Sequence, residues 1–326
     1  MSLSTFQLLR PKTLDEAVSL MANHNGEVKV VAGGTDLLPS MKQKLFTPMF
    51  VLDLRGVTEL RGIRSSADGT EIGALTTLTA LEHSSVIRRD YAVLYQAVKT
   101  VASPVLRNMG TLGGNVCLDT RCLWYNQSLS WRKSCGFCLK KDGNICHVAP
   151  GGKFCWAAFS GDTAPALLCL GAEIEIASAS GLRRTPLSEF YVNDGIVRLK
   201  LAKNEIVTRI HLPETAAGWR GSYQKLRIRG SIDYPLAGVA VALKMNSGRI
   251  EDARVAITAV NPAPHLLKDV DVHLIGIAPT EEIAERIGEM AARTAKPLTT
   301  SVLTPEYRRE MVRVYAKRAV MQAAAN

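Results

Sequence analysis

The stretch from Thr111 to Asp162 restricts the possible folds of this chain more than any other. It begins with a glycine turn made by Thr111, Leu112, Gly113, Gly114 and Asn115. Six of the seven cysteines follow before a second turn at Gly161 and Asp162, in a segment without the apolar periodicity of a helix or strand. So long a loop is uncommon unless it has a function or is held by a bound group. The sequence therefore predicts a cofactor fold that carries an inserted cysteine site.

The composition indicates a soluble globular protein with more than one domain. A chain of 326 residues exceeds the size at which one hydrophobic core usually keeps growing, so two or three domains are expected. No apolar run approaches the roughly 20 residues of a membrane span, and the first residues lack the pattern of a signal peptide. A cytoplasmic location is therefore predicted. Thiols stay reduced in that compartment, so clustered cysteines favour metal or redox chemistry over disulfides.

The net charge of +10 is spread along the chain in short runs and forms no single basic stripe. Aromatic residues make up only 6 % of the chain and no nucleic-acid-binding motif is present, which argues against a nucleic-acid partner. An anionic ligand or an acidic protein partner explains the excess of lysine and arginine better.

A short strand pattern runs into an earlier glycine turn. The residues concerned are Lys29, Val30, Val31, Ala32, Gly33, Gly34, Thr35 and Asp36. Glycines let backbone amides approach a phosphate without obstruction by side chains. One such turn is more often structural, but two of them, each beside a threonine, predict a pyrophosphate site. Neither has the spacing of a dinucleotide fingerprint or an ATP phosphate loop, which argues against nicotinamide and ATP.

The cysteine spacing matches neither the compact motif of bacterial ferredoxins nor the paired motif of zinc ribbons. The thiols concerned are Cys122, Cys135, Cys138, Cys146 and Cys155. Soft thiolates suit both zinc and iron-sulfur clusters, so structural zinc, a four-iron cluster and inert thiols all stay open. The neighbouring pyrophosphate site favours the cluster, because a cluster beside a redox cofactor forms an electron path. Cys169, in an apolar run, is predicted to be a buried hydrophobic residue.

Secondary-structure patterns differ between the two ends of the chain. A capping box at Thr13 begins a helix. A strand at 29–31, helical character at 37–44 and a strand at 50–54 then form a small β-α-β unit. A strand at 71–77 and a helix at 91–102 follow. Strands at 222–228, 236–245 and 254–260 then precede two helices that begin after Thr280 and Thr304. We predict an α+β fold whose C-terminal helices pack on one face of an antiparallel sheet, with a domain boundary at 214–218.

Together these motifs resemble the FAD-binding subunits of the molybdenum hydroxylases, the family of xanthine dehydrogenase and carbon monoxide dehydrogenase. The resemblance implies a two-part FAD-binding domain of the vanillyl-alcohol-oxidase (PCMH) type, made by residues 1–55 and 56–215, and an α+β domain at 216–326. It identifies the two glycine turns with the FAD pyrophosphate loops. It also identifies Asp162 with an acidic residue facing the FAD ribose, and Lys225 with a lysine near the isoalloxazine.

The inserted segment at about 119–159 resembles the branch represented by 4-hydroxybenzoyl-CoA reductase, whose corresponding subunit holds FAD and a 4Fe-4S cluster. The implied reaction is reductive removal of a phenolic hydroxyl from an aromatic CoA thioester. It would occur at molybdenum in another subunit, so no catalytic residue is expected in this chain. The implied partners are a 2Fe-2S subunit, a molybdopterin subunit and a ferredoxin that donates electrons.

The same resemblance narrows the choice of cluster ligands to four of the six thiols. Cys117 follows the second glycine turn so closely that ligation would distort the turn. The family places one cysteine after Trp131-Arg132-Lys133, and Cys138 fits that place better than Cys135. The implied ligands are Cys122, Cys138, Cys146 and Cys155, and Cys135 stays open as a replacement for one of them.

Overall fold

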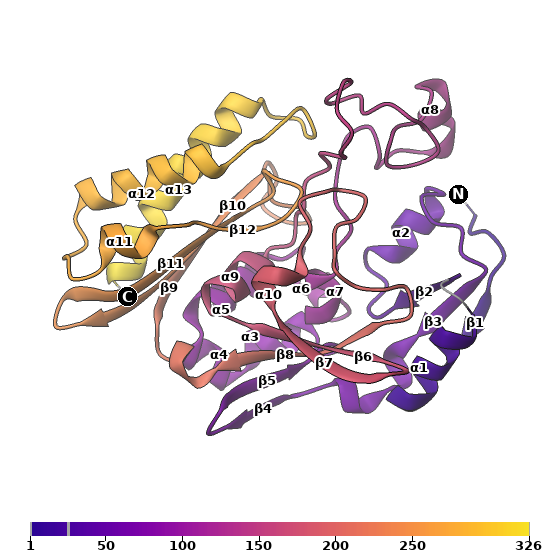
Figure 1. Ribbon diagram of the computed structural model, residues 1–326, viewed down its shortest axis with the longest axis horizontal. Coiled ribbons are helices and arrows are strands. Elements are labelled where there is room, and N and C mark those ends of the chain that lie inside the picture. Colours follow the sequence, from indigo (N-terminus) through magenta and orange to yellow (C-terminus); the bar gives the residue numbers. More distant parts are fainter. Residues whose placement is uncertain (1, 25–26, 326) are drawn as a thin grey trace.

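Three β-sheets follow one another along the chain in the computed structural model, which describes residues 2–24 and 27–325 (Figure 1). The first sheet lies within residues 7–53, the second within 63–213 and the third within 220–266. No helix in the described part of the chain is both long and apolar enough to cross a lipid bilayer. The predicted division into domains at residues 55 and 215 stays a prediction.

The first sheet is parallel, with three strands in the order β1-β3-β2. Its elements, in chain order, are β1 (Gln7–Leu9), α1 (Leu14–Asn23), β2 (Val28–Val31), α2 (Leu37–Lys42) and β3 (Phe50–Asp53). This arrangement confirms the predicted β-α-β unit, and the Thr13 hydroxyl caps α1 by accepting a hydrogen bond from the Glu16 amide (3.2 Å). The sequence pattern misses β1, because a strand of three residues with two of them exposed has no apolar alternation. Two short 3₁₀ turns follow β3 at Leu54–Gly56 and Thr58–Leu60.

The second sheet is antiparallel, with five strands in the order β4-β5-β8-β6-β7. Its strands are β4 (Ile63–Ser66), β5 (Gly69–Gly73), β6 (Glu173–Ser178), β7 (Gly181–Pro186) and β8 (Ile206–Pro213). The predicted strand at 71–77 ends early, at Gly73. Beyond it the Leu75 amide donates to the Leu60 carbonyl (2.8 Å), so the chain leaves the sheet and runs toward the second glycine turn.

Besides α8 (Leu129–Ser134) of the cysteine-rich segment, seven short helices lie between the strands of this sheet in the sequence. They are α3 (Leu78–His83), α4 (Ser85–Asp90), α5 (Ala92–Thr100), α6 (Pro104–Arg107), α7 (Leu112–Val116), α9 (Thr163–Cys169) and α10 (Leu187–Phe190). Apolar side chains of all these seven helices except α6 share one core with Ile72, Ile174 and Ile210 of the sheet. The helix predicted at 91–102 corresponds to α5, and Cys169 is fully buried in this core, as predicted.

The third sheet is antiparallel, in the order β12-β11-β10-β9. Its strands are β9 (Arg220–Leu226), β10 (Ala237–Asn246), β11 (Arg249–Thr258) and β12 (His265–Leu266). Strands β10 and β11 form a hairpin, and Ser247 and Gly248 in its turn both have positive φ (47° and 79°), as a tight hairpin turn requires. Strand β11 begins at Arg249, earlier than the predicted 254, because its first residues, although mostly polar, pair with β10. A 3₁₀ turn at Glu214–Ala216 precedes this sheet.

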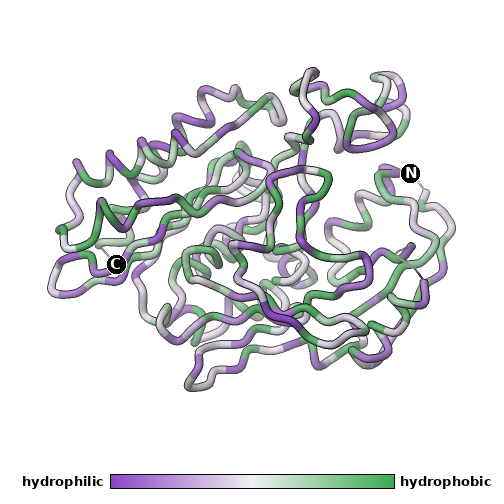
Figure 2. Tube along the Cα trace, viewed as in Figure 1, coloured by the Kyte–Doolittle hydropathy of each residue, from purple (hydrophilic) through white to green (hydrophobic). Residues whose placement is uncertain are grey.

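Helices cover both faces of the third sheet. The apolar side chains of α11 (Val270–Leu274), α12 (Glu281–Thr294) and α13 (Pro305–Ala325) share a core with the valines of β10, which confirms the predicted packing. In Figure 2 these helices alternate between hydrophilic and hydrophobic residues, as expected of helices with one buried face. The other face contacts α5 and α9 through Ala240, Ala242 and Ala256. Small side chains there let α5 and α9 approach the sheet closely.

The cysteine-rich segment, residues 119–159, contains one short helix, α8 (Leu129–Ser134), and otherwise forms loops. It stands apart from the three sheets in Figure 1. Both of its ends are joined by a pair of backbone hydrogen bonds of 2.8 Å between Arg121 and Ala158. Other contacts hold it to the body: the Leu123 amide donates to the Thr300 carbonyl (3.0 Å), and the Arg132 guanidinium donates to the Lys44 carbonyl (3.0 Å).

A buried arginine of α13 provides a test of this arrangement. Arg308 is 1 % exposed and donates to the carbonyls of Leu236 (2.8 Å), Leu298 (2.9 Å) and Ala259. Replacing it by methionine keeps a similar volume but removes these hydrogen bonds, at about 1–3 kcal/mol for each buried carbonyl left unsatisfied. The Leu298 carbonyl still accepts from the Thr300 amide (2.7 Å). We expect Arg308→Met to lower the midpoint of thermal unfolding by many degrees. The neighbouring, exposed Arg309→Met should change it little, and equal midpoints for the two variants would contradict this account.

Candidate cofactor cleft and cysteine site

The two predicted glycine turns lie directly against each other. A Cβ atom added to Gly33 would come within 1.8 Å of the Met109 carbonyl oxygen, just before the second turn. Gly34 has a φ of +73°, a left-handed conformation that glycine adopts readily. In the second turn, a Cβ atom on Gly113 would come within 2.7 Å of the Ala74 Cβ. Close approach of backbones therefore requires glycine at both turns.

The two turns differ in the amides that they leave free. Within the part of the chain that the structure describes, the amides of Gly33, Gly34 and Thr35 donate to no protein acceptor. In the second turn, Gly113 donates to the Ala74 carbonyl (2.9 Å) and Gly114 to the Thr111 hydroxyl (3.1 Å). The first turn thus offers donors to an anion, whereas the second forms a fixed wall beside it.

Asn115 connects the second turn to the turn at Gly161 and Asp162. Its side-chain oxygen accepts hydrogen bonds from the Thr163 amide (3.1 Å) and hydroxyl (2.7 Å). A Cβ atom on Gly161 would lie 2.9 Å from the Asn115 carbonyl oxygen. The three predicted cofactor segments therefore meet in one place.

These segments line a cleft of about 890 Å³, a volume typical of small-molecule and cofactor sites. The predicted cofactor residues on its wall are Lys29, Val30, Val31, Ala32, Gly33, Gly34, Thr35, Asp36, Thr111, Gly113, Gly114, Asn115 and Asp162. Leu112 is instead fully buried in the core that the short helices share with the five-stranded sheet. Lys225 is not on the wall.

The cleft has an excess of uncompensated positive charge. Each carboxylate on its wall forms an ion pair with a lysine or arginine; these carboxylates are Asp36, Asp119, Asp162, Glu205 and Asp233. Lys29 and Lys203 also line the wall, and among the described residues neither has a carboxylate partner. Burial lowers the pKa of Lys29, so an anionic ligand beside it would favour its charged form. The cleft is therefore suited to a negatively charged ligand.

Asp162 and Lys225 form a buried ion pair at the edge of the cleft. The Lys225 ammonium lies 2.9 Å from one carboxylate oxygen, and the Tyr223 hydroxyl donates to the other (2.8 Å). Lys225 also donates to the Thr100 carbonyl (2.9 Å). In this structure Lys225 holds Asp162 in place from strand β9, and its predicted position near the isoalloxazine stays a prediction.

Three segments meet at Asp36. Its carboxylate accepts hydrogen bonds from the Arg121 guanidinium (2.9 Å) and the Tyr234 hydroxyl (3.1 Å). The guanidinium also lies over the Tyr234 ring, 4.2 Å from its centroid. All three side chains line the cleft, and Tyr234 comes from the loop between β9 and β10. This contact therefore joins the C-terminal domain to the first glycine turn.

The four predicted cluster ligands line one small cavity. Cys122, Cys138, Cys146 and Cys155 are each 6–8 % exposed and face it together with Tyr125, Lys140 and other residues. Cys117 lines the main cleft instead, and Cys135 is only half-buried and lines neither cavity. In the described residues, no group of three or more His, Cys, Asp or Glu side chains is arranged to hold a metal ion. The cluster ligands therefore stay a prediction.

Sequence reasoning does not single out several polar residues of the two cavities. They are Asp119, Arg121, Lys140, Arg198 and Tyr234. Asp119 and Arg121 directly follow the second glycine turn, so their proximity to it is a usable signal. Arg198 and Tyr234 are distant in the sequence from every motif, and only the folded chain brings them to the cleft.

The residues present fit FAD, and four cysteines supply the thiol donors that the predicted cluster would take. The free amides at Gly33, Gly34 and Thr35, the space that a Cβ atom would fill and the unpaired lysines suit the diphosphate of FAD. The four thiols suit an iron-sulfur cluster, whose thiolate ligands each bind a different iron and so surround the cluster. Burial raises the pKa of Cys122 to about 12 and that of Cys155 to about 11, so loading metal there would release protons.

Known families match nearly the whole chain. The family described as FAD binding domain in molybdopterin dehydrogenase matches residues 4–215, and the CO dehydrogenase flavoprotein C-terminal domain matches residues 221–323. Among similar proteins, the carbon monoxide dehydrogenase medium chain of Afipia carboxidovorans is 29 % identical over 98 % of this chain and 97 % of its own. The aldehyde oxidoreductase FAD-binding subunit of Escherichia coli K12 is 31 % identical over 83 % of this chain and 86 % of its own.

A solved structure agrees with these matches. Reconstituted CO dehydrogenase from Oligotropha carboxidovorans contains a chain with a TM-score of 0.83 and 27 % sequence identity to this one, and the alignment covers 100 % of this chain and 99 % of that chain. The free amides, the cationic cleft and the two glycine turns described above are the features that such a domain needs to bind FAD. The chain belongs to the family of FAD-binding medium subunits of the molybdenum hydroxylases.

Proposed function

We propose that this chain is an electron-transfer subunit that holds FAD and a 4Fe-4S cluster within a molybdenum enzyme of the 4-hydroxybenzoyl-CoA reductase type. The observation that supports the cluster is the cavity lined by Cys122, Cys138, Cys146 and Cys155. Three of these thiols also pack in a hydrophobic cluster with Leu45 and Tyr125, and four buried thiols around one cavity suit a thiolate-bound cluster. Asp119 of the cleft wall contacts Lys140 and Tyr125 of the cysteine cavity, so the two proposed cofactor sites are joined by direct side-chain contacts.

In this proposal the chain supplies binding and orientation, and the cofactors supply the redox chemistry. The amides of Gly33, Gly34 and Thr35 donate to the FAD diphosphate, and Lys29 and Lys203 compensate its charge. Asn115 and Asp162 fix the facing wall. No residue of the chain is assigned a catalytic role, because the proposed bond-breaking step takes place in a partner subunit.

The proposed reaction takes place at molybdenum in a partner subunit. The ring C–OH bond of an aromatic CoA thioester breaks and a C–H bond forms, and two electrons and two protons are consumed as water leaves. Electrons pass from a ferredoxin to this chain, then to a 2Fe-2S subunit and the molybdopterin subunit. The "medium chain" names of the relatives support membership of such a multi-subunit enzyme, and the chain's charge of +10 suits an acidic donor. A cytoplasmic location is part of the proposal.

The first test addresses the FAD site. Gly34→Val would force a β-branched residue to a φ of +73°, at a cost of about 1–2 kcal/mol, and would place a side chain beside the donor amides. We expect purified Gly34→Val to lose most of its noncovalent FAD, measured as flavin released on denaturation. Gly248→Val carries the same backbone strain at a φ of +79° in a distant hairpin and should keep its FAD. Full flavin content in Gly34→Val would contradict the assignment of this turn.

The second test distinguishes the cysteines by metal content. In anaerobically purified protein, Cys135→Ser should keep its iron and acid-labile sulfide, because Cys135 does not face the cavity. Cys146→Ser should lose most of both. Loss of iron in Cys135→Ser together with retention in Cys138→Ser would reverse the ligand choice. Zinc without sulfide in the unaltered protein would instead indicate a structural zinc site.

The third test separates an electron-transfer subunit from a self-sufficient enzyme. We expect the isolated chain, supplied with an artificial reductant, to reduce no aromatic CoA thioester, whereas the assembled complex does so. Product formation by the isolated chain, measured by chromatography of the thioesters, would refute the electron-transfer role.

A further inference from the structure

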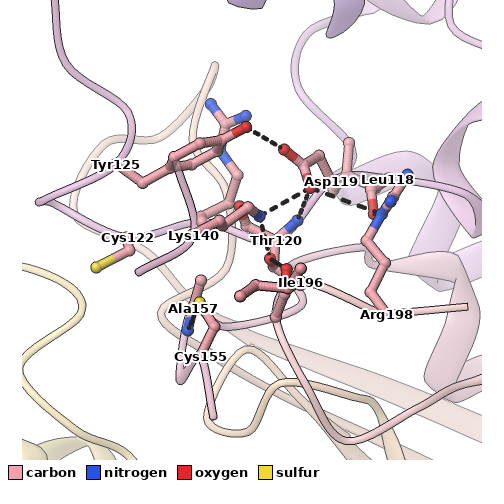
Figure 3. Close-up of polar contacts among 12 residues, drawn as sticks. Leu118, Asp119, Thr120, Cys122, Tyr125, Lys140, Cys155, Ala157, Ile196 and Arg198 are labelled. Atoms are coloured by element: carbon pink, nitrogen blue, oxygen red, sulfur yellow. Dashed lines mark hydrogen bonds and ion pairs between the residues drawn. The ribbon is translucent and has the colours of Figure 1, made fainter. Parts of the chain in front are cut away.

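An ion pair between Asp119 and Lys140 connects the lining of the FAD cleft with the lining of the cysteine cavity. Asp119 lines the cleft, whereas Lys140 and Tyr125 line the cysteine cavity. The Lys140 ammonium lies 2.8 Å from one Asp119 oxygen, and the Tyr125 hydroxyl donates to the other (2.9 Å) (Figure 3). Asp119 therefore lines the FAD cleft, whereas Lys140 and Tyr125, which bind its carboxylate, line the cysteine cavity.

This ion pair is unusually well enclosed. The side chains of Asp119 and Lys140 are each 7 % exposed. Lys140 also donates to the Thr120 carbonyl (3.1 Å), and its ammonium lies 4.2 Å from the centroid of the Tyr125 ring. Buried charges interact over longer distances than exposed ones, because little water screens them. Both charges therefore act on whatever occupies the neighbouring cavities.

The Lys140 ammonium lies nearer to the cysteine cavity, and the Asp119 carboxylate lies nearer to the FAD cleft. Lys140 lies on the side of the four thiols, as Figure 3 shows for Cys122 and Cys155. Asp119 lies behind it, and the Arg198 guanidinium approaches Asp119 to 3.6 Å from the side of the cleft. A cation next to a cluster favours the state with one more electron, and an anion disfavours it.

We propose that the Asp119–Lys140 ion pair sets the reduction potential of the cluster held by Cys122, Cys138, Cys146 and Cys155. Lys140 raises the potential and Asp119 lowers it. Both are positioning residues that do not bind the cluster, and this inference rests on the function proposed above. If the pair served only to hold residues 119–159 against the body, replacing either partner would loosen the segment but would not shift the potential in opposite directions.

The test is a redox titration of the cluster in the full complex, followed by electron paramagnetic resonance. We expect Lys140→Met to shift the midpoint potential of the cluster downward and Asp119→Asn to shift it upward. Lys140→Arg, which keeps the charge, should stay close to the unaltered protein. Lys141→Met is the matched control, because Lys141 is the next residue, is partly exposed and pairs with Asp142 (3.0 Å) instead.

Each outcome decides the question. Equal potentials in the unaltered protein, Lys140→Met and Asp119→Asn would overturn the inference, as would shifts of the same sign. If Lys140→Met fails to retain iron, Asp119→Asn and Lys140→Arg still decide: the absence of an upward shift in Asp119→Asn rejects the proposal. Absence of iron from the unaltered complex would refute the cluster itself, so failure of the proposed function is distinguishable from failure of this inference.

Discussion

Contact between the backbones of two distant turns is the constraint on which the cleft depends. Gly33 approaches the Met109 carbonyl so closely that any side chain would push the turns apart. Asn115 then fixes the turn at Gly161 and Asp162 through its hydrogen bond with Thr163. Helices α7 and α9 continue from these turns into the core beneath the five-stranded sheet. The cleft is therefore shaped by backbone atoms, whose positions are set by the sheets, and its donors need no flexible side chain to find their geometry.

The C-terminal domain is more than an appended layer. Its sheet presents valines to its own helices and alanines to α5 and α9, so two cores meet across one sheet. Lys225 and Tyr223 of β9 hold Asp162, and Tyr234 reaches Asp36. Polar contacts from this domain thus fix residues on both sides of the cleft. Binding of a cofactor there and docking of the C-terminal domain are expected to stabilise each other.

Much of the fold could be predicted where the signal is local. Capping residues such as Thr13 and Thr280, the hairpin turn at Ser247 and Gly248, and the two glycine turns are each specified by a few neighbouring residues. Strand β1 and the end of β5 at Gly73 could not be predicted from the sequence, because they depend on pairing with distant segments. The resemblance to a known family led to the prediction of the four cysteines that line the cavity. The ion pair of Asp119 with Lys140 was not predicted, because neither residue belongs to a motif and the sequence does not distinguish a buried lysine from an exposed one.

The hydrogen bonds between Arg121 and Ala158 give the cysteine-rich segment a property unlike that of an ordinary loop. They bring its two ends to adjacent positions, so the flanking chain follows the same path whatever lies between them. A closed loop of this kind lengthens at a small cost in entropy. Such a segment can therefore be added to a flavin domain or removed from it at two neighbouring positions of the backbone. A protein engineer who transplants it to a relative must also supply the body contacts of Leu123 and Arg132.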